Sequence, residues 1–99
     1  MDIVISPSTK KNKKYKAVIN NDKTIHFGSS AHSDFTRHKD TERKERYIAR
    51  HKKNEDWTKS GVDTAGYMSR WINWNMPTIE ESVKDLNKKY KDISFKLKK

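Results

Sequence analysis

The amino-acid sequence predicts an α+β domain in which a small antiparallel sheet packs on two or three helices. Three observations predict this class. Two β-rich stretches flank an asparagine-rich turn, three segments carry apolar residues at helical spacing, and the last residues alternate between apolar and polar. With 99 residues the chain has room for one domain. We expect that domain to span residues 14–99, preceded by a basic flexible arm over residues 1–13.

A β-hairpin is predicted at the start of the domain. Residues 15–19 and 24–27 are rich in β-branched and aromatic residues, and the Asn-Asn-Asp-Lys sequence at 20–23 tolerates a tight turn. A second β-signal comes at the other end of the chain, where apolar residues alternate with polar ones over residues 93–97. We expect this C-terminal strand to pair with the hairpin.

The first predicted helix is strongly charged. Asp40 is a good N-cap residue, Glu42 suits the positive end of the helix dipole, and the helix should continue to about residue 53. Arg43, Arg46 and Arg50 share one face of this helix because they are three and four residues apart. The neighbouring face has a narrow apolar stripe that we expect to lie on the hairpin.

Two further helices follow. Residues 64–75 form the densest apolar segment of the chain, and we expect the three tryptophans, Trp57, Trp71 and Trp74, to build the core with it. Pro77 ends that helix. Thr78 and Glu81 have the spacing of a capping box, so a third helix should begin there and continue to about residue 89.

The composition indicates an anionic partner. Lysine and arginine number 23 against 13 acidic residues, giving a net charge of +10. Charge of this sign attracts phosphates, and it also attracts acidic protein surfaces. No stretch is long and apolar enough for a membrane span, so we expect no membrane partner. The charge by itself does not distinguish nucleic acid from protein.

The arginine row is the best binding candidate, because guanidinium groups pair with phosphates bidentately. A Glu42–Arg46 pair within the helix would divert one arginine from a ligand. Other basic residues cluster close to this helix and in the predicted arm. The expected phosphate contacts are Arg37, Lys39, Arg43, Arg46, Arg50, Lys52 and Lys53, with Lys10, Lys11, Lys13 and Lys14 around the end of the arm.

No pattern of residues indicates catalysis. His-Lys-Lys at residues 51–53 has the His-x-Lys spacing of phospholipase D-type phosphodiesterases, but Thr58 stands where that motif needs an aspartate. Gly-Ser-Ser at residues 28–30 could hold a phosphate through backbone amides, although it lacks the lysine spacing of a P-loop. The four histidines lack a recognised metal-ligand spacing, and there is no cysteine. We expect a protein that is not an enzyme and needs no metal or cofactor.

Residues 27–77 as a whole resemble a family of small basic proteins encoded by large and giant DNA viruses that replicate in eukaryotic cytoplasm. The resemblance lies in the basic helix HKDTERKERYIARH (38–51), in Trp57, and in TAGYMSRWINW (64–74). The family pattern commonly has Phe-Trp where this chain has Tyr67-Met68. The resemblance implies a viral origin and a role in the virion or at the cytoplasmic replication site. It supplies no catalytic residues.

Two functions are compatible with this resemblance. In the first, the protein binds viral DNA without sequence specificity and helps to condense or package it. In the second, it is a minor capsid or other structural protein of the virion whose basic surface bridges acidic subunits. Both use the same charged residues, so the sequence leaves the choice between them open.

Overall fold

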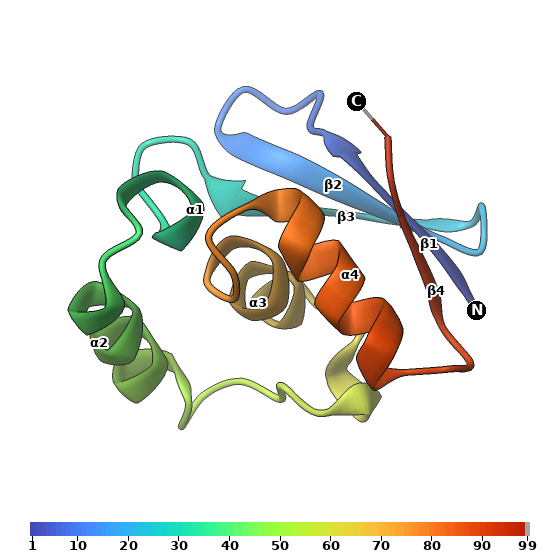
Figure 1. The fold of residues 1–99 in the computed structure, drawn as a ribbon. Helices are drawn as coiled ribbons and strands as arrows, with labels where there is room; N and C mark the ends of the chain where they lie inside the picture. Colours follow the sequence, from blue (N-terminus) through green and yellow to red (C-terminus); the bar gives the residue numbers. More distant parts are fainter. Residues whose placement is uncertain (99) are drawn as a thin grey trace.

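A computed structural model describes residues 1–98 of the chain and shows a sheet with helices on one face (Figure 1). The strands are β1 (Asp2–Pro7), β2 (Lys13–Ile19), β3 (Lys23–Ser29) and β4 (Ser94–Leu97). The helices are α1 (Phe35–His38), α2 (Thr41–His51), α3 (Ala65–Met68) and α4 (Ile79–Lys89), with a 3₁₀ turn η1 (Lys59–Gly61) and a π-helical segment η2 (Ser69–Asn73). The predicted α+β class is confirmed.

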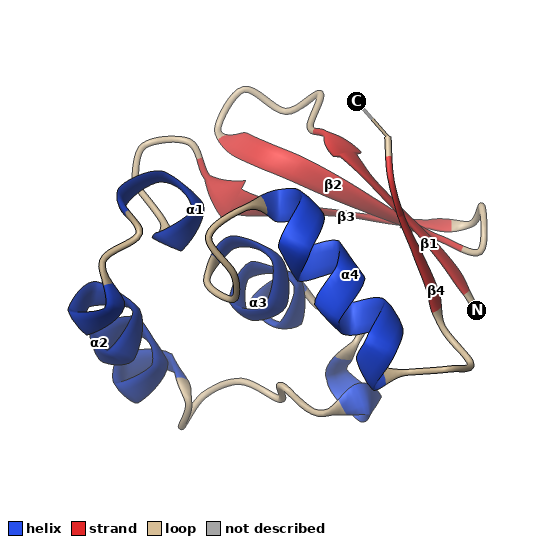
Figure 2. Cartoon of the chain, in the orientation of Figure 1, coloured by secondary structure: helices blue, strands red, loops and turns tan. Residues whose placement is uncertain are grey.

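The sheet has the strand order β3-β2-β1-β4 and is mixed (Figure 2). β2 and β3 form the predicted hairpin, in which Asn20 and Asn21 take positive φ angles of 51° and 58°. The prediction of a purely antiparallel sheet is wrong, because β4 is parallel to its neighbour. That neighbour is β1, so β4 does not pair with the hairpin.

The predicted flexible arm at residues 1–13 is also wrong. β1 lies inside the sheet, antiparallel to β2 on one side and parallel to β4 on the other. Ile3 and Ile5 are fully buried and alternate with more exposed positions, which is the pattern of a strand with one face on the core. The burial of two isoleucines and the hydrogen bonds to two neighbouring strands hold this segment in the sheet, although the residues that follow are basic and polar. Lys99 lies outside the described residues.

The core lies between the sheet and the helical layer of α3, η2 and α4, which covers one face of the sheet in Figure 1. Each layer contributes large side chains with almost no exposed surface. They include Ile3, Ile5, Phe27 and Phe95 from the sheet, Tyr67, Met68 and Ile72 from α3 and η2, and Leu86 from α4. The hydrophobic effect of joining these two layers is the main stabilising contribution to the fold.

The tryptophans are placed differently from the prediction. All three are half-buried, and only Trp71 packs on the hydrophobic core. The expectation that Trp71 and Trp74 both lie in the core assumed a regular α-helix over residues 64–75. The π-helical turn of η2, which Trp74 closes by donating its backbone N–H to the Ser69 carbonyl, is wider and rotates Trp74 toward α2.

The helix boundaries follow the predicted caps. Asp40 accepts hydrogen bonds from the Glu42 and Arg43 amides at the start of α2, and Thr78 accepts one from the Glu81 amide at the start of α4. α2 ends at His51, two residues before the predicted end. It does not lie on the hairpin, because the aromatic rings of its inner face stack on Trp74 instead.

The short helix α1 was not predicted. Asp34 caps it by accepting hydrogen bonds from the Thr36 amide, at 3.0 Å, and the Thr36 hydroxyl. Lys39 ends it in the left-handed conformation with φ of 54°. A single turn of this length carries no helical periodicity, so its sequence signal is limited to the cap.

Gly61 is expected to tolerate no side chain. A Cβ added there would lie 2.1 Å from the Asp56 carbonyl oxygen, whereas one added at Gly66 would meet the movable end of the Glu55 side chain. Gly61→Ala should therefore lower the free energy of unfolding by about 1–3 kcal/mol. Gly66→Ala is the matched control and should be close to neutral, because alanine is the better residue in helix α3. Urea unfolding of both variants measures this; equal stability of the two would contradict the close approach at Gly61.

Candidate functional site

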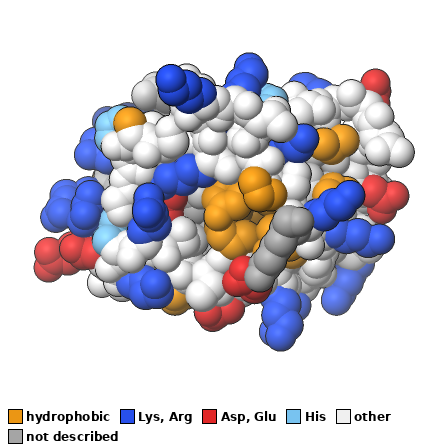
Figure 3. Space-filling model, turned by 90° about the horizontal axis from the view of Figure 1, so that it is seen from above, with side chains coloured by type: hydrophobic (Ala, Val, Ile, Leu, Met, Phe, Trp, Pro, Cys, Tyr) orange, Lys and Arg blue, Asp and Glu red, His pale blue; other side chains and the backbone are white. Residues whose placement is uncertain are grey.

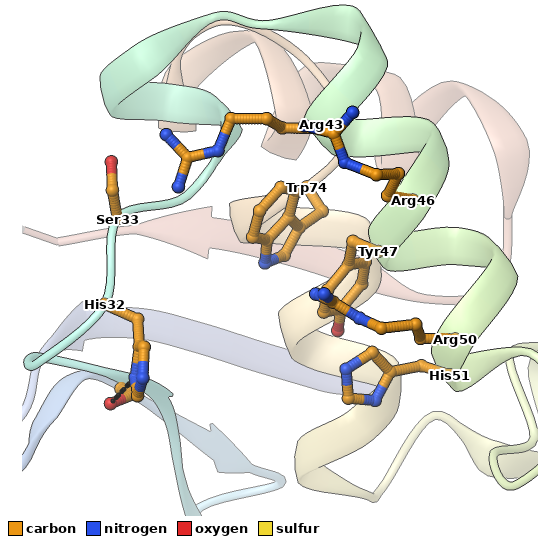
Figure 4. Close-up of a pocket in the computed structure, with 9 residues that line it drawn as sticks. His32, Ser33, Arg43, Arg46, Tyr47, Arg50, His51 and Trp74 are labelled. Carbon is orange, nitrogen blue, oxygen red and sulfur yellow. Dashed lines mark hydrogen bonds between the residues drawn. The ribbon is translucent and has the colours of Figure 1, made fainter.

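A pocket of about 620 Å³ opens between α2, the loop that joins β3 to α1, and the residue that ends η2 (Figure 4). Its size is typical of small-ligand sites, which measure roughly 300–1,000 Å³. Nine residues line it: Ser29, His32, Ser33, Arg43, Arg46, Tyr47, Arg50, His51 and Trp74. We call this the α2 pocket.

Among the described residues, the lining of the α2 pocket has three guanidinium groups and no carboxylate. The helical spacing of Arg43, Arg46 and Arg50 brings all three to the same wall, and Figure 4 shows Arg43 and Arg50 extending over the space that faces the β3–α1 loop. Of these three arginines, only Arg46 forms an ion pair with another residue in the range 1–98, namely with Glu42 at 4.0 Å. Both side chains of that pair are largely exposed, so it contributes little. The pocket therefore concentrates uncompensated positive charge.

Stacked rings form the floor of the pocket. Tyr47 lies against Trp74 with ring centroids 4.4 Å apart and planes 4° apart, and His51 packs on Tyr47 at 4.4 Å. Burial raises the pKa of Tyr47 well above its ordinary value, so the phenol remains protonated and able to donate a hydrogen bond. The indole nitrogen of Trp74 points toward the open space in Figure 4. The floor thus adds hydrogen-bond donors to those of the arginines.

Lys44 anchors α2 to the rest of the domain. Its ammonium donates to the Asn75 carbonyl at 2.6 Å and lies 4.7 Å from the centre of the Phe35 ring. Burial lowers the pKa of Lys44 from its ordinary value. Because Lys44 is adjacent to Arg43 and three residues before Tyr47, this contact fixes the orientation in which α2 presents its arginines.

Asp34 holds the opposite wall. It is 3% exposed, pairs with the Lys14 ammonium at 2.5 Å, and accepts a hydrogen bond from the Asn73 amide at 3.3 Å. The β3–α1 loop is thereby tied both to β2 and to η2. At its outer end, the Ser29 hydroxyl and His32 Nδ1 are 3.0 Å apart and hydrogen-bonded (Figure 4).

A smaller recess of about 80 Å³ adjoins the α2 pocket and shares Ser29, His32, Ser33, Tyr47 and Trp74 with it. Its remaining lining includes Lys14 and Asn73. Asn73 is 1% exposed, and its Oδ1 has no hydrogen-bond partner among the described residues. Gly28, with φ of 78°, leaves room beside that oxygen, because a Cβ there would lie 3.0 Å from it. A buried acceptor without a partner is uncommon and costs free energy unless a ligand or water satisfies it.

The comparisons with known proteins give one match. The chain is similar over residues 3–51 to a family of unknown function, DUF5754. No curated protein and no solved structure matches it. The matched residues extend from β1 to the end of α2 and therefore include the three arginines, but not Trp74. Because the function of that family is unknown, the match assigns no chemistry to the pocket.

No group of three or more histidine, aspartate and glutamate side chains in residues 1–98 is placed to hold a metal ion. None of the helices in that range has the length and apolar character needed to cross a bilayer.

The structure brings the predicted arginines together but separates the predicted lysines from them. Lys52 and Lys53 are exposed in the turn after α2, and Arg37 and Lys39 are exposed at the end of α1. None of these four side chains lines the α2 pocket. These four residues are close to the pocket residues in the sequence and add exposed positive charge next to them.

The lysines expected on the arm are also outside the pocket. Lys10 and Lys11 are exposed in the connection between β1 and β2, and Lys13 is half-buried at the start of β2. The prediction that Lys14 contacts phosphate is wrong, because its ammonium already binds the Asp34 carboxylate. The same ammonium also donates to the His32 carbonyl at 2.7 Å. It stabilises the pocket wall instead.

Six lining residues were not predicted as part of the site: Ser29, His32, Ser33, Tyr47, His51 and Trp74. Part of this was visible in the sequence, because the small-residue loop had the composition of a backbone phosphate site and Tyr47 and His51 adjoin the arginine row. The position of Trp74 depends on the π-helical turn, which helical periodicity does not reveal.

Proposed function

We propose that this protein binds nucleic acid without sequence specificity, through phosphate contacts centred on the arginines of α2. The observation that carries the proposal is the α2 pocket itself, where residues 1–98 contribute three guanidinium groups and no carboxylate to one concavity. Arginine pairs with phosphate oxygens bidentately, and each contact releases counterions from the nucleic acid. Neither step requires recognition of a base.

The surroundings of the pocket support the same ligand. Exposed basic residues follow α1 and α2, and in Figure 3 lysine and arginine side chains lie at the end of the molecule that carries these helices as well as at the opposite end. A nucleic acid seated at the pocket would meet further positive charge on either side. The net charge of +10 adds long-range attraction to any polyanion.

From the resemblance to small basic proteins of large DNA viruses, we propose that this activity belongs to the virion or to the cytoplasmic replication site. There the protein would help to condense or package viral DNA. We propose a binding protein and no enzymatic activity. A role as a minor capsid protein on acidic subunits is an outcome that the following experiment can reveal.

Binding of a labelled random-sequence duplex at about 50 and 200 mM salt tests the proposal. If about five phosphates are neutralised, the affinity should fall by roughly 10²–10³ between the two conditions. Fluorescence anisotropy measures the dissociation constant in each. Absence of binding at 50 mM salt would overturn the proposal and direct attention to acidic virion proteins.

A charge-removing variant locates the interface. Substituting Gln for Arg43, Arg46 and Arg50 together should lower the slope of log affinity against log salt by about 2–3, because about 0.9 is lost for each phosphate contact. The melting temperature should stay close to that of the parent, since these side chains form no buried contacts. The matched control removes the same charge from exposed lysines on and after α4: Lys84, Lys88 and Lys91. Equal losses in the two variants would place the interface elsewhere.

A further inference from the structure

The α2 pocket has a shape that non-specific duplex binding does not require. A polynucleotide backbone follows an open groove or a convex surface, whereas this pocket is concave and adjoins a recess bounded by the buried side chains of Asp34 and Asn73. Such a site can enclose the end of a strand more completely than its middle. We infer that the pocket takes a terminal phosphate monoester of a nucleotide, on a strand end or on a free mononucleotide.

The charge of the pocket favours a monoester over the diesters along a strand. A monoester carries about −1.5 to −2 at neutral pH and three acceptor oxygens, as phosphorylated side chains do. An internal diester carries one negative charge and only two terminal oxygens. Arg43 and Arg50 approach from one wall with Trp74 between them, and the described lining offers no carboxylate to repel a dianion (Figure 4). The third oxygen and the extra negative charge of a monoester can therefore be bound by donors that already line the pocket.

The recess accounts for the rest of the ligand. Asn73 Oδ1 is a buried acceptor without a partner among the described residues, and the Asp34 carboxylate in the same lining is already paired with Lys14. A hydroxyl of the ribose or an amino group of a base can donate to this oxygen while the phosphate of the same nucleotide binds the arginines. Inorganic phosphate has no sugar or base and supplies only the phosphate. The rings of Tyr47 and Trp74 form the apolar surface between the recess and the arginines. This combination of phosphate, hydrogen-bond donor and flat apolar part is that of a nucleotide.

The inference rests on the proposed function in taking a nucleic-acid phosphate as the ligand, and the test separates the two. Three single-stranded oligonucleotides of one sequence carry a phosphate at the 5′ end, at the 3′ end, or at neither end. Their affinities are measured by anisotropy at about 50 mM salt with an internal fluorophore. Adenosine monophosphate and inorganic phosphate serve as competitors and are titrated alone by calorimetry.

We expect one phosphorylated oligonucleotide to bind at least tenfold more tightly than the unphosphorylated one, with adenosine monophosphate competing better than phosphate. Arg50→Gln should remove this preference, and Lys84→Gln on α4 should preserve it. Binding of adenosine monophosphate without binding of any oligonucleotide would support the pocket assignment for a free nucleotide and overturn the proposed function. Equal affinity for all three oligonucleotides, with no competition by adenosine monophosphate, would overturn the inference and leave the proposed function standing.

Discussion

Removal of residues 1–8 is expected to prevent the domain from folding. These residues contain β1, which separates β2 from β4 in the sheet and pairs with both. Without β1, β4 has no neighbour in the sheet and β2 pairs only with β3, and the fully buried side chains of Ile3 and Ile5 are lost from the core. The free energy of unfolding of a small domain is only about 5–15 kcal/mol, so these losses exceed it.

Circular dichroism and thermal unfolding of the shortened chain measure the result. Two point variants keep the test decisive if that chain is poorly soluble. Ile5→Ala should lower the free energy of unfolding by about 2–5 kcal/mol because it leaves a cavity in the core. Val4→Ala, one residue away on the other face of the strand, should cost clearly less because Val4 is only half-buried. A cooperative transition at an unchanged temperature after the deletion would mean that residues 1–8 are an appendage.

Asp34→Ala is expected to lower the free energy of unfolding by about 3–5 kcal/mol. The substitution leaves the ammonium of Lys14 without its carboxylate in a site where the lysine side chain is 14% exposed. It also removes the cap of α1 and the partner of the Asn73 amide. The β3–α1 loop would then lose its attachments to β2 and η2, so the α2 pocket should lose nucleic-acid affinity as well.

The exposed pair of Lys23 and Asp63 is the matched control. Its side chains are 56% and 51% exposed, and Asp63→Ala should change the free energy of unfolding by no more than about 1 kcal/mol. A second control replaces Lys14 with methionine together with Asp34→Ala, which removes the unpaired charge and should restore part of the stability. Denaturant unfolding of the parent, Asp34→Ala, Lys14→Met and the double variant measures the coupling energy of the buried pair, and Asp63→Ala is unfolded beside them. Equal effects of Asp34→Ala and Asp63→Ala would contradict the burial of the first pair.

Local sequence signals predicted the hairpin and the helices that begin at strong caps. Asp40 and Thr78 act through hydrogen bonds to amides two and three residues away, and the turn at residues 20–23 acts through the backbone preferences of asparagine. These contacts join near neighbours in the chain. They are therefore encoded in short stretches of sequence and can be inferred without the rest of the molecule.

The place of β1 and the parallel pairing of β4 could not be inferred in this way. Residues 3–5 are a short apolar run without alternation, and followed by a proline and then by lysines they fit a mobile segment equally well. What selects the strand is pairing with β2 and with β4, and the β4 partner lies about ninety residues further along the chain. The same holds for Trp74, whose position follows from the π-helical turn and its stacking on Tyr47.

The sequence by itself determined the charge of the candidate site, because helical spacing alone aligns Arg43, Arg46 and Arg50. Only the tertiary structure decided that this row faces a pocket, since the opposite wall comes from the β3–α1 loop and the floor from Trp74. The tertiary structure also pairs Lys14 with Asp34, so that Lys14 is not available to bind a ligand. The physical reason is range. Helix periodicity acts over a few residues, whereas a concave site requires segments far apart in sequence to be brought together by the core.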